Sequence, residues 1–259
     1  MKIKKNSAFT LIETMIAMAI SVICVAAIYY SYLFVKNSYE GLENKTVINS
    51  FGRDSLSKIS KDLRNAGYHN INYTSPKWDR EIEQKNNYNN TNSDLLIIWY
   101  NSSAKDRLKI SYYLKKDQST NAMSLVRDQI LNPKVKNQWG YGLNLNCSAE
   151  ASKQTNCQPK VVVPYVTDFQ VVLKDKNGSE LTNVCGSDSC SAIGRGNQSK
   201  VYTAEVYLTV RSKDEVYEKN KKTRIINHNS STGKDQTLSA DRYLRETFFI
   251  SVHTRNLPI

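Results

Sequence analysis

The longest feature of the hydrophobicity pattern is a nearly unbroken apolar run near the amino end, from Phe9 to Phe34. This run of 26 residues contains one charged residue, Glu13, and neither proline nor glycine. As an α-helix it would be about 39 Å long, and about 20 apolar residues are enough to cross the hydrocarbon core of a membrane. The pattern therefore predicts a membrane-spanning helix over residues 9–34.

Beyond the apolar run the pattern becomes that of an amphipathic helix. Leu56, Ile59, Leu63 and Ala66 follow one another at steps of three, four and three residues, which places them on one helical face. Charged side chains fill the opposite face, and Gly67 follows as a stop signal. We therefore expect one helix over residues 9–66 whose second half packs on a folded head.

The rest of the chain, residues 67–259, is long enough for one hydrophobic core, and its pattern predicts β-structure. Its apolar or alternating runs predict strands over residues 94–100, 107–114, 165–175, 201–212 and 245–256. An Asn-Gly pair within residues 175–180 predicts a hairpin turn, in preference to a calcium loop whose other ligands are missing. Loops are expected over the polar stretches 83–94 and 212–236. The expected fold class is α+β, a long helix packed on an antiparallel β-sheet.

Charges and cysteines indicate which side of the membrane holds the head. Lys2, Lys4 and Lys5 precede the apolar run, which favours a cytoplasmic amino end and an exported head. Four cysteines lie in the exported part, and an even set there predicts two disulfides. Three pairings of these cysteines are possible, and we prefer the one that joins sequence neighbours, Cys147–Cys157 and Cys185–Cys190. The spacings C-x9-C and C-x4-C do not favour a zinc site. The four residues are Cys147, Cys157, Cys185 and Cys190.

Glu13 is the residue that a simple membrane anchor does not explain. A carboxylate in a membrane helix is energetically costly and usually has a partner. Two explanations stay open from its position alone. Either Glu13 is an assembly contact with another chain, or it lies near enough to the interface to reach water.

The segment KKNSA followed by FTLIETMIAMAI resembles the leader and helix start of type IV prepilins and pseudopilins. The resemblance implies that residues 1–8 are a leader, that a prepilin peptidase cuts between Ala8 and Phe9, and that Phe9 is N-methylated. It also implies that Glu13 is the assembly contact, paired with the amino terminus of a neighbouring subunit. Two features depart from the family: Ala8 stands where glycine is usual, and residues 9–40 contain no helix breaker.

Two further stretches resemble minor pilins of the PilW type, KDLRNAGYHN (61–70) and DRYLRETFFISVHTRNLP (241–258). That resemblance implies a non-catalytic subunit that primes pilus assembly with other minor pilins and the major pilin, located at the pilus tip and serving twitching motility, adhesion or DNA uptake. A tip adhesin is a further partner that it suggests. The protein would lie in the bacterial inner membrane with its head in the periplasm, and on the cell surface after assembly. A J-type minor pseudopilin of type II secretion is the alternative.

The formal net charge is +12, and removal of the three leader lysines would lower it to +9. A basic patch is expected at Lys213, Lys219, Lys221, Lys222 and Arg224, next to acidic residues that dilute it. A solvated loop explains this segment better than DNA binding, which stays a weaker hypothesis.

Catalysis is not expected. The three histidines, His69, His228 and His253, are not at metal-ligand spacings, and neither a hydrolase motif nor a phosphate-binding glycine loop is present. We therefore expect neither a cofactor nor a metal.

Overall fold

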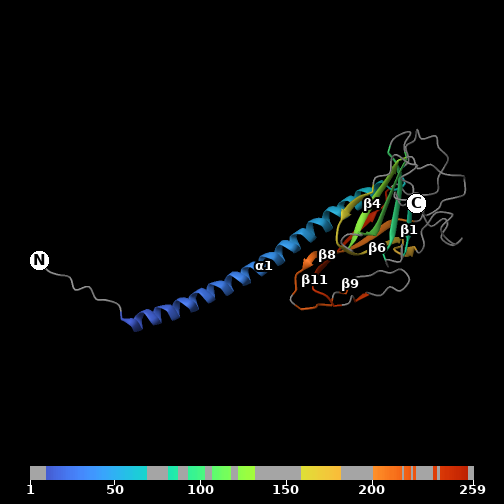
Figure 1. Ribbon diagram of the computed structural model, residues 1–259. Helices are drawn as coiled ribbons and strands as arrows, with labels where there is room; N and C mark the ends of the chain where they lie inside the picture. The colour runs from blue at the N-terminus through green and yellow to red at the C-terminus, as the bar shows by residue number, and fades with distance from the viewer. Residues whose placement is uncertain are drawn as a thin grey trace. The chain divides into compact units, whose positions relative to one another are not determined.

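The computed structural model describes most of the helix and the strands that form the head (Figure 1). The described residues are 10–68, 81–86, 93–102, 107–117, 122–131, 159–181, 201–217, 219–222, 224–225, 236–237 and 240–255. The chain divides into two compact units, Met1–Lys45 and Thr46–Ile259, and each is considered by itself.

One α-helix, α1, runs from Leu11 to Asn65. The helix ends where Gly67 adopts a φ of 72°, a left-handed conformation that glycine reaches without a Cβ penalty. The Gly67 amide then donates a hydrogen bond to the Trp99 carbonyl at 2.9 Å, which leads the chain into the sheet region. The stop signal predicted at Gly67 is confirmed.

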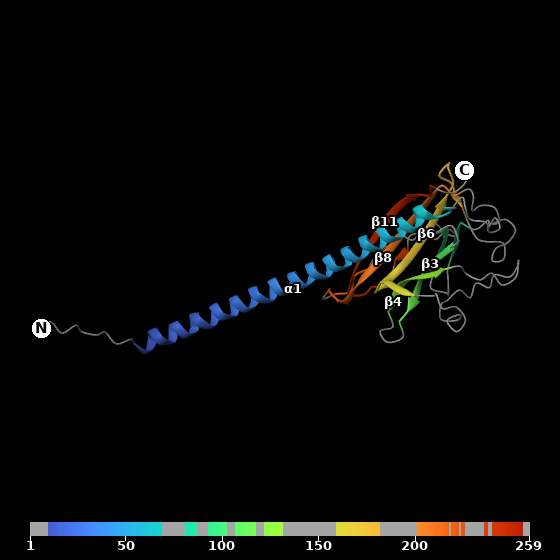
Figure 2. The same cartoon turned by 90° about the horizontal axis from the view of Figure 1, so that it is seen from above.

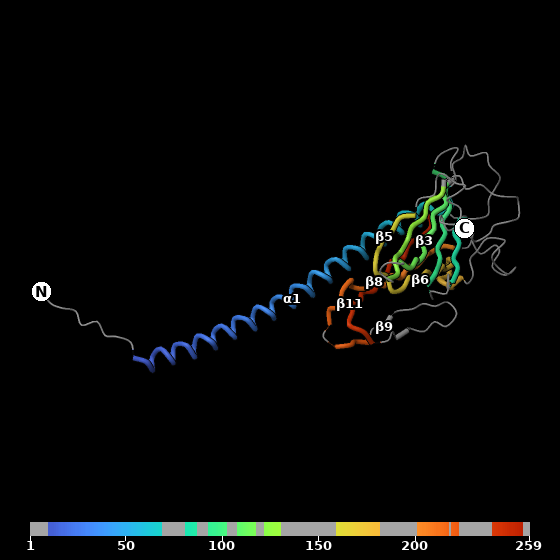
Figure 3. Tube along the Cα trace, viewed as in Figure 1, coloured from blue at the N-terminus to red at the C-terminus, as the bar shows by residue number. Residues whose placement is uncertain are grey.

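The strands are antiparallel and form two main sheets. One sheet contains, in order, β1 (Ile82–Lys85), β2 (Leu95–Asn101), β3 (Arg107–Lys116), β4 (Met123–Leu131) and β5 (Lys160–Val163). The other contains β11 (Tyr243–His253), β8 (Thr203–Glu215), β6 (Val166–Lys174) and β7 (Glu180–Leu181). Figure 3 traces the chain through the head, from green in β3 to red in β11. A small pair joins β9 (Arg224–Ile225) to β10 (Gln236–Thr237).

The α+β prediction, a long helix on antiparallel strands, is confirmed, although two sheets are present where one was expected. The chain changes sheets between β5 and β6, through Pro164 and Tyr165. Proline lacks the amide hydrogen that a central strand needs, and Tyr165 has a φ of 57°, so the backbone bends sharply here. The Tyr165 carbonyl accepts a hydrogen bond from the Arg211 amide at 2.8 Å, which holds the bend against β8.

All five predicted strands are present, and the predicted turn is confirmed at Asp175. The Asp175 carboxylate accepts hydrogen bonds from the amides of Asn177 and Ser179, and Gly178 has a φ of 81°. The prediction of loops over 83–94 and 212–236 was partly wrong, because β1, the end of β8, β9 and β10 lie within those ranges. Two further strands, β4 and β5, were not predicted.

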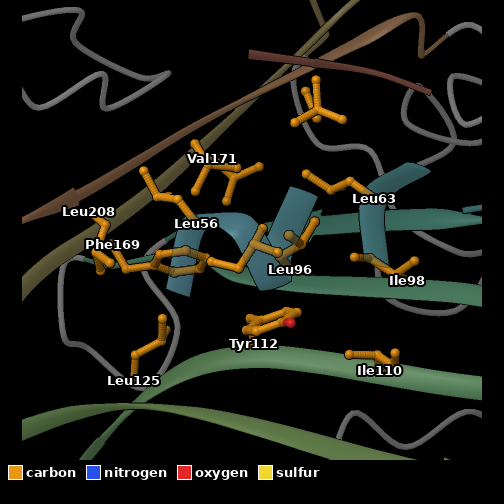
Figure 4. Packing of buried hydrophobic residues seen from close by; sticks show 14 of the residues in the cluster. Leu56, Leu63, Leu96, Ile98, Ile110, Tyr112, Leu125, Phe169, Val171 and Leu208 are labelled. Atoms are coloured by element: carbon orange, nitrogen blue, oxygen red, sulfur yellow. The ribbon is translucent and has the colours of Figure 1, made fainter. Parts of the chain in front are cut away.

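The core lies between the last turns of α1 and both sheets. Its helix residues form the predicted stripe and are packed with apolar side chains from β2, β3, β6 and β8 (Figure 4). The buried residues of this cluster from the helix and the position just after it are Ile48, Leu56, Ile59, Leu63 and Ala66. Burial of such a stripe is the main source of stabilisation for a helix in a folded domain.

On the side of the four-stranded sheet, the helix approaches β11 at Gly52 (Figure 2). A Cβ atom added at Gly52 would lie 2.3 Å from Cε2 of Phe248 and 2.6 Å from its Cγ, well inside van der Waals contact. The close approach of helix and strand therefore requires glycine at this position. At Gly41, by contrast, an added Cβ would meet nothing within 4 Å.

On the side of the five-stranded sheet, a buried ionic network joins the helix to β3 and β4. Asp62 accepts hydrogen bonds from Nε of Arg127 at 2.8 Å and from the hydroxyl of Tyr112 at 2.6 Å. A second Arg127 nitrogen donates to Gln129 at 2.8 Å. Burial, together with the negative charge of Asp62, raises the pKa of Tyr112, so the phenol stays protonated and remains a donor.

A second polar network joins the two sheets to each other. Asp94, at the start of β2, accepts the Val171 amide of β6 at 2.9 Å, and its own amide donates to the Phe169 carbonyl at 2.8 Å. Next to this contact, Asp168 accepts hydrogen bonds from Ser93 at 3.0 Å and Gln170 at 2.9 Å. Burial raises the pKa of Asp168, against the lowering effect of these donors.

The first prediction concerns Gly52. We expect Gly52→Ala to lower the free energy of unfolding by about 1–3 kcal/mol, the usual cost of overpacking, because Phe248 must move away. Gly41→Ala is the matched control and should raise helix stability by up to about 1 kcal/mol. Thermal unfolding of the full chain in detergent measures the stability of both variants. An equal gain in stability for the two variants would contradict the close approach at Gly52.

The second prediction concerns the ionic network. Arg127→Met leaves Asp62 buried without its cation and should destabilise the head by about 3–5 kcal/mol. The triple variant Arg127→Met, Asp62→Leu, Tyr112→Phe removes every charge and should recover most of that loss. Chemical denaturation compares the free energy of unfolding of the single and triple variants. A loss of stability under about 1 kcal/mol for the single variant would show that the ion pair is effectively solvated.

The third prediction concerns pH. Because the folded state raises the pKa of Asp168, folding favours the protonated acid, and stability falls as the pH rises from the ordinary value of 3.8 through the raised one. Asp168→Asn should therefore be more stable than wild type at neutral pH, with the gain vanishing near pH 3.8. Ser93→Ala removes a hydrogen-bond donor to the Asp168 carboxylate. It should therefore enlarge the fall in the free energy of unfolding as the pH rises. Denaturation at several pH values tests this, and a gain for Asp168→Asn that does not change with pH would contradict it.

Candidate assembly site

Glu13 lies in the first turn of α1, where it forms a reciprocal cap with Thr10. Oε2 of Glu13 accepts hydrogen bonds from the Thr10 amide at 2.8 Å and the Thr10 hydroxyl at 2.9 Å. In return the Glu13 amide approaches the Thr10 hydroxyl oxygen at 3.4 Å. This is a capping box, which satisfies amide groups that the start of a helix otherwise leaves unpaired.

The cap was not predicted from the sequence, although Thr-x-x-Glu before an apolar run is its known signature. The cap also changes the interpretation of Glu13. Both donors of Thr10 are neutral, so they orient the carboxylate without cancelling its charge. The side chain is exposed on the helix surface, where a cation from another chain can reach it. Capping and an intermolecular ion pair are thus compatible roles for one residue.

The processing residues, Ala8 and Phe9, lie outside the described residues, so cleavage and N-methylation stay predictions. The same holds for the predicted disulfides of Cys147, Cys157, Cys185 and Cys190.

The surface of the first part of α1 suits an apolar environment. Its side chains from Leu11 to Val35 are exposed almost throughout, and it is the one helix of the described chain that is long and apolar enough to cross a membrane. Its serine hydroxyl groups are satisfied internally, since Ser21 and Ser31 donate to carbonyls one turn earlier at 2.7 and 2.9 Å. Tyr29, Tyr30 and Tyr32 lie near the end of the apolar stretch, as is typical where a helix leaves the hydrocarbon core.

The predicted basic patch stays a prediction. Lys213, Lys219, Lys221 and Lys222 are all exposed, and nothing is described of the Arg224 side chain. Lys221 lies over the Tyr217 ring at 3.8 Å. Exposed Asp214 and Glu215 lie in the same segment, and Glu215 forms an ion pair with Arg242, so the local charge is mixed.

A cluster that the sequence did not reveal holds the start of β11. Asp241 receives two hydrogen bonds from the Arg245 guanidinium, each 2.5 Å long, and these hold the pKa of the Asp241 carboxyl below its ordinary value. Arg211 lies over the Tyr243 ring at 4.1 Å and farther from the Tyr165 ring, at 5.7 Å. The signal was hidden because these residues come from three separate segments.

Among the described residues no three His, Cys, Asp or Glu side chains form a group that could hold a metal ion. His253 contacts the Tyr202 ring at 5.1 Å and the Thr203 hydroxyl at 3.0 Å, while His69 and His228 lie outside the described residues.

Comparison with known proteins agrees with the amino-terminal geometry. A family model described as "Prokaryotic N-terminal methylation motif" matches residues 3–29. No curated protein matches the chain. Among solved structures, the type IV-like pilin TTHA1219 from Thermus thermophilus is similar at 13% identity and a TM-score of 0.41, over 78% of this chain and 93% of that one. The chain therefore carries a prokaryotic N-terminal methylation motif at the start of an apolar helix that can span a membrane.

Proposed function

We propose that this protein is a minor pilin of a type IV pilus, a non-catalytic subunit that primes filament assembly. The observation that carries the proposal is the capped, charged Glu13 at the start of a helix that bears the methylation motif. An anchor needs neither a carboxylate in its apolar segment nor a processing signal before it. A subunit that must align with its neighbours inside a membrane has a use for both.

The assembly step follows from the charge of Glu13. Cleavage after Ala8 would create a new amino group on Phe9, four residues before Glu13. The ammonium group of one subunit and the carboxylate of the next would compensate each other in an apolar medium, where neither is stable alone. Thr10 holds the carboxylate at the start of the helix, so the contact also sets the axial position of one helix against the other.

The head supports a place at the pilus tip. A head that contains two main sheets is hard to accommodate among close-packed subunits of a shaft and easier at its end. The partners in this proposal are the major pilin, other minor pilins and a prepilin peptidase, with a tip adhesin as a further candidate. The unassembled subunit would lie in the inner membrane with its head in the periplasm.

The fourth prediction separates the two roles of Glu13. Glu13→Gln keeps an oxygen that can accept the Thr10 hydrogen bonds but removes the charge. In a deletion strain whose retraction motor is also disabled, we expect Glu13→Gln to fail to restore surface pili, as Glu13→Ala does. Thr10→Ser keeps the capping hydroxyl and should restore pili. Restoration by Glu13→Gln would show that capping alone is required.

Two controls make this result interpretable. Intact mass measurement of each variant must show loss of residues 1–8 and one added methyl group, so that failure is not a processing defect. Secreted enzymes are measured in the same strains. Failed secretion with normal pili would replace the proposal with the pseudopilin of a type II secretion system.

A further inference from the structure

The outer edge of β11 differs from every other edge of the two main sheets. β1 and β5 have four residues each and β7 has two, and short edges offer little backbone for another strand to pair with. β11 has eleven residues and lies at the margin of its sheet, where it pairs with β8 alone among the described strands (Figure 2). It is the one long edge in the described part of the head.

The second half of this edge lacks the usual features that protect against pairing. The segment from Thr247 to Val252 has no charge, proline or glycine, and the charged residues and the one irregularity in the pairing lie earlier in the strand, between Tyr243 and Glu246. Phe249 is 53% exposed although it sits in the middle of the strand. An exposed, uncharged and regular edge is prone to aggregation unless a partner covers it.

The register shows which backbone groups face outward. The Thr254 amide, one residue past the strand, donates to the Tyr202 carbonyl at 3.1 Å, so even-numbered residues bond toward β8. The odd-numbered residues therefore direct their amides and carbonyls to the open edge. They are Arg245, Thr247, Phe249, Ser251 and His253.

One end of this edge has an excess of positive charge, because two guanidinium groups share one carboxylate. Arg245 forms an ion pair with Asp241, and the charge of the nearby Arg211 also helps to lower the pKa of the Asp241 carboxyl. Arg211 lies opposite Arg245 in the register and stacks on tyrosine rings, and its buried Nη1 atom has no hydrogen-bond partner among the described residues. Two cations with one anion between them favour a further carboxylate brought by an incoming strand.

Charge also argues against a second copy of this chain as the occupant. Two β11 strands paired antiparallel about Phe249 would place Arg245 of one copy opposite His253 of the other. Such a pair would place a histidine, and no further carboxylate, beside the two arginines at each end. A strand from a different protein can supply the missing charge.

We propose that the β11 edge binds an extended strand of another protein by strand addition. The incoming strand carries an apolar residue beside Phe249 and, four positions away on the same face, an Asp or Glu near Arg211. The added strand would extend the four-stranded sheet to five. This inference does not depend on the assembly role of Glu13.

The test uses the full chain in detergent micelles and a fluorescent nine-residue peptide. The peptide has aspartate at its first position, phenylalanine at its fifth, and threonine or valine elsewhere. One control peptide replaces two inner residues with proline, which removes amide donors, and another replaces the aspartate with lysine. We expect saturable binding of the first peptide and at least tenfold weaker binding of both controls, with slowed amide exchange at Thr247, Phe249 and Ser251.

The matched variants are Ser251→Pro and Ser251→Ala. Proline is tolerated at an edge position whose amide faces outward, so Ser251→Pro removes one donor while β11 keeps its bonds to β8. It should weaken peptide binding at least tenfold, and Ser251→Ala should change binding less than twofold. Thermal unfolding checks that Ser251→Pro is folded, and the amide-exchange result stands without any variant.

Three outcomes would overturn the proposal. One is equal binding of the peptide and its proline control. Another is unchanged amide exchange along β11 at saturating peptide. The third is dimerisation of the full chain without peptide that Ser251→Pro abolishes, which would make a second copy the occupant. None of these outcomes would affect the pilus assay, so the two proposals fail separately.

Discussion

The ion pair between Asp62 and Arg127 determines how the helix sits in the head. Asp62 is the one carboxylate that the described part of α1 buries, and its partners come from two adjacent strands of one sheet. An apolar stripe can slide or rotate by a small amount and still be buried. A buried carboxylate cannot, because a shift that breaks its bonds leaves a charge without compensation. The pair therefore contributes more to the orientation of the helix than to net stability.

The opposite side of the helix is fixed by shape. At Gly52 the backbone comes so close to Phe248 that no side chain fits between them. With Asp62 fixed on one sheet and Gly52 on the other, ten residues apart, the rotation of the helix is fixed at two points. The apolar residues between them, among them Leu56 and Ile59, then supply burial to both sheets.

The two longest strands were predicted from a clear alternation of apolar and polar residues. In β8 and β11 the apolar residues recur at every second position of long runs, so the alternation alone predicted them. β4 was missed because its polar residues enter the protein: Arg127 reaches Asp62, and Asp128 accepts the hydroxyl of Tyr113 at 2.8 Å. A pattern of apolar and polar letters cannot show that two polar residues satisfy each other across 65 positions of chain.

Glu13 and the start of β11 likewise differ in whether the sequence alone could reveal them. Glu13 could be singled out from sequence because a charge in an apolar helix breaks a local rule, and its cap with Thr10 was readable in the same four letters. The cluster at the start of β11 could not be predicted, since Arg211, Tyr243 and Tyr165 meet only after the sheet has formed. What Glu13 and the β11 edge share is a feature that a free subunit would be better without. A solitary chain gains nothing from an uncompensated carboxylate in lipid or from an uncovered hydrophobic edge. Another chain would stabilise both features by binding to them, which is the physical reason to look for the function of this protein in assembly.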